Sequence, residues 1–297
     1  MVSVIIPFIN EYTLLQEAVQ SVQAQDMTSW ELIIVRNHAE PFDPNRKSQL
    51  PPDTKFIHEP QPGSAFARNA GLQAASGDWI QFLDVDDLLL PGKISHQLSQ
   101  QDGDAVVSPH LFQSLDGRRI KSRWISDDLW SGLLNSGLGS TSSMLFRKQA
   151  LLEVGGWNQD YQSHQEYEVL FRLMKTGKKV LAIDQTETVV RARSSGSITK
   201  STIPIRAIEG VKLRESMWHF LEASGMTSPA RYDAFRQYVF QNLRGLFKIN
   251  AGQAMEKYKE YFNKKEFEPA QIPFTGYHFF YKTFGFALTE HVINLFT

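Results

Sequence analysis

The sequence predicts an α/β fold in which helices flank a mostly parallel central sheet, followed by a C-terminal α-helical appendage. In the first hundred residues, short apolar runs rich in β-branched residues alternate with amphipathic segments, which is the order expected of parallel strands joined by helices. From about residue 203 the pattern is helical to the end. We therefore expect an α/β domain over residues 1–202 and a helical region over residues 203–297.

Four apolar runs in the first third of the chain predict buried strands. They cover residues 2–6, 30–35, 55–58 and 79–83. A helix is expected over residues 13–24, where Thr13 and Gln16 could form a capping box. A second helix, opened by Gly63 and Ser64, is expected over residues 65–75.

The next hundred residues are less regular. Strand-like segments cover residues 105–112, 120–124, 142–146, 179–183 and 188–191, and helical ones cover 148–154 and 165–176. The run Leu115-Asp116-Gly117-Arg118 predicts a hairpin turn between the first two strands. After residue 203, helical segments are expected over 211–223, 232–247 and 255–262.

Composition excludes several classes of protein. With 42% apolar and 21% charged residues the chain is typical of globular proteins, and a net charge of -1 gives no field that would attract nucleic acid. The absence of cysteine excludes disulfides, cysteine-ligated zinc and thiol nucleophiles. The N-terminus does not resemble a signal peptide, and no run reaches the ~18 apolar residues of a membrane span. A cytoplasmic protein is expected.

The run Phe82-Leu83-Asp84-Val85-Asp86-Asp87 places three carboxylates at the end of a buried strand. Two residues of extended backbone span about 6.6 Å and share a face, so Asp84 and Asp86 could point toward one cation. Hard oxygen ligands suit Mg²⁺ or Mn²⁺, ions that commonly accompany phosphate. The alternative is a solvated acidic turn before the next element.

Polar and turn-forming residues follow several of the predicted parallel strands. Pro7, Arg36-Asn37 and the acidic run all lie at the carboxyl ends of strands. In open α/β sheets ligands bind beyond these ends, so one crevice could collect them. Arg68 lies on the helix opened by Gly63, whose N-terminus could present backbone donors to a phosphate. A salt bridge from Arg68 to a nearby aspartate is an equal alternative.

Five blocks, in order over roughly residues 2–200, resemble family 2 glycosyltransferases with the GT-A fold. The blocks are Val2 to Asn10 with its Pro-x-x-Asn turn, Ser21 to Gln25 with Trp30 to Val35, Ala67-Arg68-Asn69-Ala70-Gly71, the acidic run, and Gly155-Gly156-Trp157 with Glu166-Tyr167-Glu168 and Arg172. The resemblance implies an inverting transfer of a sugar from a nucleotide-diphosphate donor to a glycan or lipid-linked acceptor. It also suggests a role in surface polysaccharide synthesis.

The resemblance also implies roles for individual residues. Asp84 and Asp86 would hold Mn²⁺ or Mg²⁺ at the donor diphosphate, and Glu166 would be the base that deprotonates the acceptor hydroxyl. Donor contacts are expected from Pro7, Asn10, Asn37, Arg68, Asp84, Asp87, Arg191 and Arg193. Acceptor contacts are expected from Trp157 and Glu168, although a core role for Trp157 is an equal alternative.

The chain departs from the family pattern at three places. Arg36-Asn37-His38-Ala39 stands where Asp-Asp-Gly-Ser is usual, which puts the usual uridine preference in doubt. Gln165-Glu166 replaces Glu-Asp, so a longer carboxylate occupies the position of the base. Arg193 occupies the position of a histidine and cannot ligate metal. Arg191 and Arg193 could instead bind the diphosphate, or be solvated loop charges.

Two rivals to this interpretation remain. A non-catalytic descendant of the fold that binds a nucleotide or glycan would explain the departures. A nucleotidyltransferase would need a Gly-rich loop after the first strand, and Pro7-Phe8-Ile9-Asn10 is not one. The aromatic stretch 277–288 lies outside the resemblance. It could pack on the catalytic domain, contact a membrane surface near a lipid-linked acceptor, or form a homodimer contact.

Overall fold

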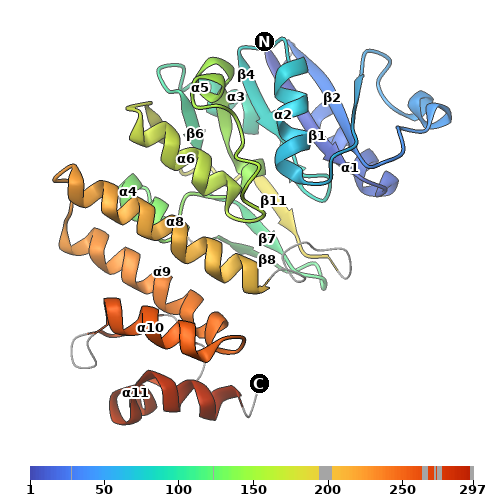
Figure 1. Cartoon of the computed structure of the whole chain (residues 1–297). Coiled ribbons are helices and arrows are strands. Elements are labelled where there is room, and N and C mark those ends of the chain that lie inside the picture. The colour runs from blue at the N-terminus through green and yellow to red at the C-terminus, as the bar shows by residue number, and fades with distance from the viewer. Residues whose placement is uncertain are drawn as a thin grey trace. The chain divides into compact units, whose positions relative to one another are not determined.

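A computed structural model describes residues 1–27, 29–122, 124–193, 203–262, 267–270, 272 and 276–294 of the chain (Figure 1). The chain forms two compact units, Met1–Ser197 and Ile198–Thr297. The predicted domain boundary at residue 202 lies outside the described residues.

A seven-stranded sheet forms the centre of the first unit. Its strands are β1 (Val2–Phe8), β2 (Trp30–Asn37), β3 (Lys55–Glu59), β4 (Trp79–Phe82), β6 (Ala105–Val107), β9 (Leu145–Arg147) and β10 (Val180–Ala182), in the order β10-β6-β9-β4-β1-β2-β3. Only the pairs made by β9 are antiparallel among these strands. The predicted mostly parallel sheet is therefore confirmed.

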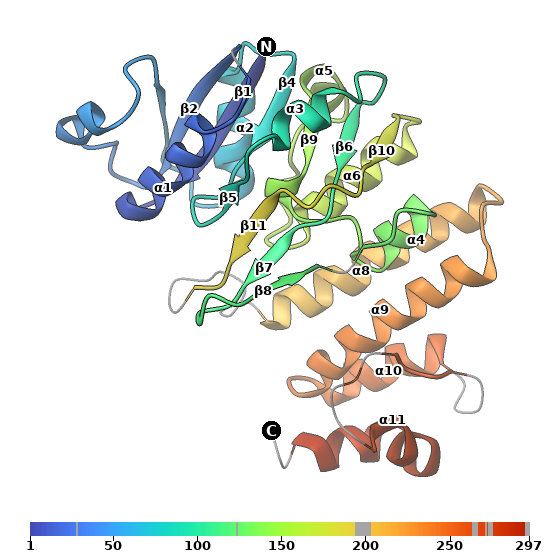
Figure 2. The same cartoon turned by 180° about the vertical axis from the view of Figure 1, so that it is seen from behind.

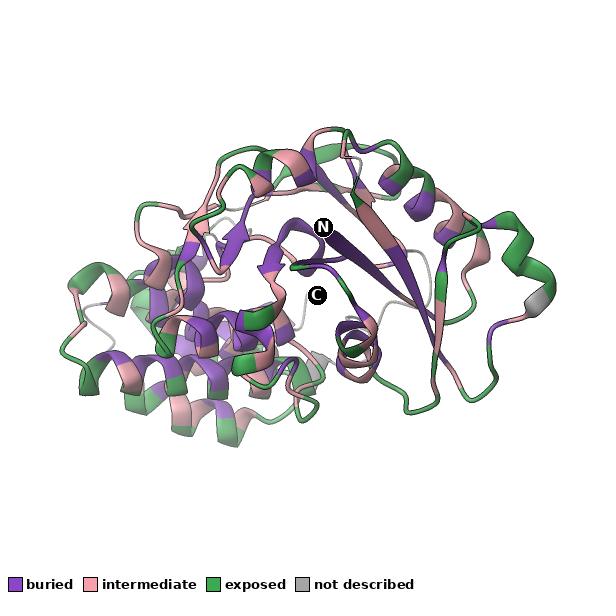
Figure 3. Ribbon diagram, turned by 90° about the horizontal axis from the view of Figure 1, so that it is seen from above, coloured by how far each residue is buried: buried purple, intermediate pink, exposed green. Residues whose placement is uncertain are grey.

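Helices cover both faces of this sheet, as Figures 1 and 2 show from opposite sides. The helices of the unit are α1 (Tyr12–Gln23), α2 (Ser64–Ala74), α3 (Lys93–Leu98), α4 (Leu129–Leu134), α5 (Lys148–Glu153) and α6 (Gln165–Lys175), with 3-10 turns at Pro44–Gln49 and Thr141–Ser143. Side chains alternate along β1, so Val4 and Ile6 join the apolar cluster of α1, while Ile5 faces α2. Figure 3 shows the middle strands of the central sheet largely buried and the outer helix faces exposed.

Gly71 brings α2 close to the sheet. A Cβ atom at this position would lie 2.4 Å from the side chain of Ile5 on β1 and 3.2 Å from that of Val35 on β2. Any side chain larger than hydrogen would therefore push α2 away from the strands. This contact places α2 directly against β1 and β2.

A smaller sheet extends the first unit. Its strands are β5 (Leu88–Leu89), β7 (Leu111–Gln113), β8 (Arg119–Lys121) and β11 (Thr188–Arg191), in the order β5-β11-β7-β8. The predicted hairpin is confirmed between β7 and β8, where Gly117 has a φ of 82°. Because β11 pairs with β5, it brings Arg191 to the segment that follows the acidic run.

Three local predictions were wrong. Helix α1 begins at Tyr12 after Glu11 and has no side-chain cap, so Thr13 and Gln16 form no capping box. The apolar run 105–112 is not one strand, because β6 joins the central sheet and β7 the smaller one. The run 142–146 begins as a 3-10 turn, and only its end belongs to β9.

The second unit is helical, as predicted. Its helices are α8 (Ile203–Ala223), α9 (Pro229–Phe247), α10 (Ala251–Tyr261) and α11 (Tyr277–Asn294). Phe240 of α9 is fully buried and contacts the rings of Tyr258, Tyr281 and Phe286 at 5.4–6.4 Å. The aromatic stretch 277–288 thus supplies part of this unit's own core.

Helix α11 also has an exposed apolar side. Phe279, Phe284 and Leu288 are 67%, 48% and 56% exposed. Gly285, with a φ of 76°, interrupts the helix between them. Among the residues that the structure describes, no helix combines the length and apolar character needed to cross a membrane.

Candidate active site

The acidic run leaves β4 at the carboxyl edge of the central sheet. Leu83 still donates its backbone N–H to the carbonyl of Ile5, and Asp87 donates its backbone N–H to the carbonyl of Asp84, which closes a tight turn. The turn directs Asp87 inward, where it is only 4% exposed. Asp84 and Asp86 keep side chains that are 37% and 24% exposed. The run therefore separates into two accessible carboxylates and one buried carboxylate.

Asp87 is held by groups from two other segments. Its carboxylate accepts a hydrogen bond from the hydroxyl of Ser142 (2.6 Å) and one from the backbone N–H of Arg191 (3.3 Å). Burial, followed by the charges of Asp84 and Asp86, raises the pKa of Asp87 well above its ordinary value. In this position Asp87 fixes the turn, and it does not face the accessible side with Asp84 and Asp86.

Asp84 and Asp86 repel one another, and arginines partly offset the repulsion. Burial and then the charge of Asp84 raise the pKa of Asp86. Asp84 accepts a hydrogen bond from Arg68 Nη2 (2.7 Å), and Arg193 Nε lies 3.7 Å from Asp86 Oδ2. The salt-bridge alternative for Arg68 is what the structure contains.

The chemistry of this donor set fits a hard divalent cation. Mg²⁺ is typically held by one or two carboxylates and completed by phosphate oxygens and water. Across the described parts of the chain, no group of three or more histidine, aspartate or glutamate side chains is arranged to hold a metal ion. A cation here would draw on Asp84 and Asp86 and take further ligands from a bound molecule.

Arg191 and Arg193 are fixed by ion pairs. Arg191 bonds to the carboxylate of Glu17 and to the carbonyl of Asp86, and Arg193 Nη2 contacts Glu11 Oε1 at 2.8 Å. The alternative of solvated loop charges is therefore wrong for both. Each guanidinium lies beside the acidic run. That both bind the diphosphate of a donor remains a prediction.

The segment after β2 forms the other edge of the site. Arg36 is buried, lies over the ring of Phe8 at 5.2 Å, and donates from Nη2 to Asn10 Oδ1 (2.9 Å). Asn37 donates to the carbonyls of Glu59 and Gln61 and accepts from the N–H of Gly63 (3.0 Å). The Asn37 side chain thus holds the loop that leads into α2. Its expected contact with the donor base stays a prediction, as does that of Pro7.

The N-terminus of α6 forms the opposite side. His164 precedes the helix with a φ of 55°, uncommon for a residue other than glycine. Glu166, the predicted base, is half-buried in the first turn. Its neighbour Gln165 accepts hydrogen bonds from Ser64 Oγ (2.9 Å) and Arg68 Nη1 (2.8 Å). Arg68 therefore contacts both Asp84 and the residue before Glu166.

Two residues predicted to contact the acceptor have structural partners instead. The ring of Trp157 is 1% exposed and packs edge-on against Phe82 at 5.1 Å, so it offers no open face to a sugar. Glu168 is 5% exposed, and Arg172 binds it with a shortest distance of 2.6 Å. These placements favour the core role for Trp157 and correct the expectation of direct acceptor contacts.

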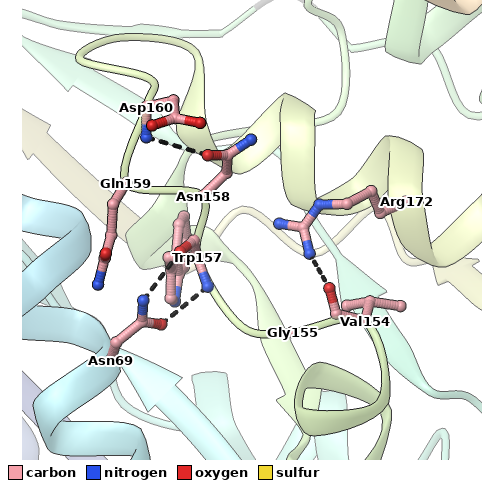
Figure 4. A pocket seen from close by; sticks show the side chains of 8 residues that line it. All are labelled: Asn69, Val154, Gly155, Trp157, Asn158, Gln159, Asp160 and Arg172. Atoms are coloured by element: carbon pink, nitrogen blue, oxygen red, sulfur yellow. Dashed lines mark hydrogen bonds between the residues drawn. The ribbon is translucent and has the colours of Figure 1, made fainter.

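A pocket of about 420 Å³ lies beside these residues (Figure 4). The side chain of Asn69 bonds to both the N–H and the carbonyl of Trp157, at 2.8 Å each, and Arg172 bonds to the carbonyl of Val154. The polar side chains of Asn69 and Arg172 in the pocket thus hold the loop between α5 and α6. The pocket is lined by Asn69, Val154, Gly155, Trp157, Asn158, Gln159, Asp160 and Arg172.

The structure joins several of the predicted site residues through two sets of contacts. The first runs from Arg36 through Asn10, Glu11 and Arg193 to Asp86, and the second runs from Asp84 through Arg68 to Gln165. Between the two sets, Asp84 and Asp86 interact by charge repulsion. Sequence reasoning missed Glu11, Glu17 and Ser142 as members of the site. Glu11 directly follows the Pro-x-x-Asn turn, which was an available signal, whereas nothing around Ser142 marks it.

Comparisons with known proteins identify the family and the fold. The family model described as glycosyl transferase family 2 matches residues 3–180. An uncharacterised glycosyltransferase of Haemophilus influenzae is 24% identical over 190 residues, or 59% of this chain and 62% of that protein. One from Nostoc sp. is 30% identical over 169 residues, or 52% of each chain. The chain thus spans less than two thirds of the length of these two relatives.

Two solved structures share the fold. The mannosyltransferase PcManGT from Pyrobaculum calidifontis, in complex with GDP-Man and Mn²⁺, has a TM-score of 0.58 at 17% identity, covering 99% of this chain and 86% of its own. Residues 1–349 of S. aureus TarS, in complex with UDP-GlcNAc, have a TM-score of 0.57 at 12% identity, covering 100% and 92%. The predicted GT-A fold is confirmed, and with the matching family model the chain belongs to glycosyl transferase family 2.

Proposed function

We propose that this protein transfers a sugar from a nucleotide-diphosphate donor to a glycan or lipid-linked acceptor, with inversion and with the help of Mn²⁺ or Mg²⁺. One observation carries the proposal. Arg68 contacts Asp84 on one side and Gln165, next to Glu166, on the other. Asp84 and the residue that precedes the proposed base thus meet at a single guanidinium.

The donor half rests on the charges around the acidic run. A divalent cation held by Asp84 and Asp86 would act as a Lewis acid on the diphosphate leaving group. Arg191 and Arg193 lie at the same carboxylates and can bind diphosphate oxygens through their N–H groups. The structural neighbours were solved with UDP-GlcNAc and with GDP-Man and Mn²⁺, which supports a nucleotide-sugar donor of either base.

The acceptor half depends on Glu166. Inverting transfer needs a base that removes the proton of the acceptor hydroxyl as that oxygen attacks the anomeric carbon. Glu168 is 5% exposed and Glu166 only half-buried, so of the two glutamates of this turn Glu166 is the more accessible to an acceptor. Its longer side chain, compared with the usual aspartate, places the carboxylate about one methylene further from the helix.

The acceptor and the setting are further parts of the proposal. A lipid-linked acceptor would bring the protein to the inner face of a membrane, and the exposed Phe279, Phe284 and Leu288 of α11 support peripheral contact there. The same residues could support a homodimer. A role in surface polysaccharide synthesis accords with such an acceptor. Vesicle binding that is unchanged after replacement of Phe279, Phe284 and Leu288 by serine would exclude this membrane contact.

A thermal-shift panel of nucleotides and sugar nucleotides, with and without Mn²⁺, tests the donor half. We expect a sugar nucleotide to raise the melting temperature in a metal-dependent manner, and Asp86→Ala to abolish this rise. Asp102→Ala, a change at an exposed aspartate, serves as the matched control and should respond as the wild type does. No response to any donor would favour the non-catalytic rival.

Transfer assays test the acceptor half. Glu166→Gln preserves the shape of the side chain but cannot accept a proton, so we expect a loss of about 10²–10⁴-fold in kcat. Donor binding should persist in this variant. Transfer that survives Glu166→Gln unchanged would remove Glu166 as the base.

A further inference from the structure

Gln165 lies where the donor half and the acceptor half meet. It is 7% exposed, and its amide oxygen accepts hydrogen bonds from Ser64 Oγ (2.9 Å) and Arg68 Nη1 (2.8 Å). Its amide nitrogen donates to the carbonyl of Tyr161 (2.6 Å). One side chain therefore ties the first turns of α2 and α6 to the loop that precedes α6.

We infer that Gln165 is a positioning residue that fixes Glu166 relative to Asp84, so that the acceptor base and the donor carboxylate move as one unit. The inference rests on the proposed function, which assigns these two carboxylates to the two ends of the transfer. Gln165 itself contacts neither donor nor acceptor in this scheme.

Arg68 transmits the position of Gln165 to the acidic run. Its guanidinium is 5% exposed, lies over Trp157 at 4.7 Å, and donates to Gln165 from one terminal nitrogen and to Asp84 from the other. Its Nε is buried and has no hydrogen-bond partner. Because a buried guanidinium has little freedom, a shift of Gln165 must move Arg68 or break this bond.

Glutamine suits this position because its amide both accepts and donates. A glutamate has the same shape and keeps the acceptor oxygen that faces Arg68, but its carboxylate would face the carbonyl of Tyr161. Tyr161 is half-exposed, so water can supply the donor that is lost. Leucine has a similar volume and supports none of the three hydrogen bonds.

Kinetics of three variants test the inference. We expect Gln165→Leu to lower kcat by about 10–100-fold, because a displacement of about 1 Å at a reacting group has effects of this size. The fall in kcat should exceed the change in donor Kd, because the expected displacement is of Glu166 relative to Asp84. Gln165→Glu should retain at least about a third of the wild-type kcat, and Gln23→Leu, at an exposed glutamine of α1, should match the wild type.

Two outcomes would overturn the inference: a kcat for Gln165→Leu within about three-fold of that for Gln23→Leu, or a Gln165→Leu defect confined to donor Kd. If Gln165→Leu does not fold, Gln165→Asn, whose amide is shorter by one methylene, should show the same pattern with a smaller fall in kcat.

A stability measurement separates this inference from the proposed function. In a double-mutant cycle of Asp84→Asn and Gln165→Glu, the changes in urea midpoint should be non-additive, because Arg68 bonds to both positions. Strict additivity would overturn the coupling whether or not the protein is active. Lack of transfer by the wild type together with a non-additive cycle would instead reject the function alone.

Discussion

Ser142→Ala removes a hydroxyl that contacts two of the three aspartates in the acidic run. Ser142 is fully buried, donates to Asp87 Oδ2 (2.6 Å) and accepts from the backbone N–H of Asp84 (3.1 Å). A hydrogen bond to a charged group contributes about 1.5–3 kcal/mol, and a neutral one about 0.5–1.5 kcal/mol. We therefore expect the free energy of unfolding to fall by about 2–4 kcal/mol.

Ser143→Ala is the matched control, because Ser143 is equally buried and its hydroxyl contacts the backbone N–H and carbonyl of Ser140 at 2.8 and 2.9 Å. Both of its bonds are neutral, so its loss should be smaller by about 1 kcal/mol. The assay is urea unfolding at pH 7–8 with a chelator, so that no divalent cation compensates the exposed carboxylates.

The pH dependence identifies the cause. The folded-state pKa of Asp87 lies above its ordinary value of 3.8. Its buried charge therefore lowers the free energy of unfolding by the full amount at pH values above the folded pKa, and has no such effect at pH values below 3.8. The hydroxyl of Ser142 favours the charged form. The excess loss in Ser142→Ala should thus be present above the folded pKa and disappear as the pH falls through it. Equal losses in the two variants, or an excess independent of pH, would refute this reasoning.

Three further changes test the packing and the charges of each unit. Trp157→Ala should lower the free energy of unfolding by about 3–5 kcal/mol, and a loss below about 1 kcal/mol in chemical denaturation would contradict the burial of this ring. Arg244→Met should cost about 3–5 kcal/mol, because it leaves the fully buried Glu290 without the guanidinium 2.8 Å away; an unchanged melting temperature would contradict this ion pair. Burial opposes ionisation of Glu31, but Lys55 and further hydrogen bonds outweigh it and lower its pKa from 4.5 to about 2. Glu31→Gln should therefore reduce the melting temperature at pH 7, and its difference from wild type should shrink as the pH falls from 4.5 to about 2.

The central sheet could be predicted because its signals are local. Residues 2–6 and 30–35 each contain one polar residue, Ser3 and Glu31, and are otherwise apolar, as expected of strands buried on both faces. Short elements such as β5 and α3 gave no comparable signal. Lys93 and Gln97 of α3 are buried and bond to groups from distant segments, so tertiary contacts determine this helix and not its own sequence.

Many residues of the site could be predicted, but which of them form ion pairs with one another could not. The acidic run and Arg68 are close in sequence, and their salt bridge was among the alternatives. The partners of Arg191 and Arg193 are glutamates more than 170 residues earlier, and no periodicity relates positions so far apart. The burial of Trp157 depends on aromatic rings from β4 and β9, which one sequence cannot place around it.

Gly71 connects the packing of the sheet to the chemistry of its edge. The missing side chain lets α2 lie against β1, and Arg68 projects from the preceding turn of the same helix to reach Asp84 at 2.7 Å. A residue with no functional group therefore determines the reach of a charged one. Substitutions at Gly71 would resemble lesions of the active site in an activity screen, although their origin is a change in the spacing between a helix and a strand.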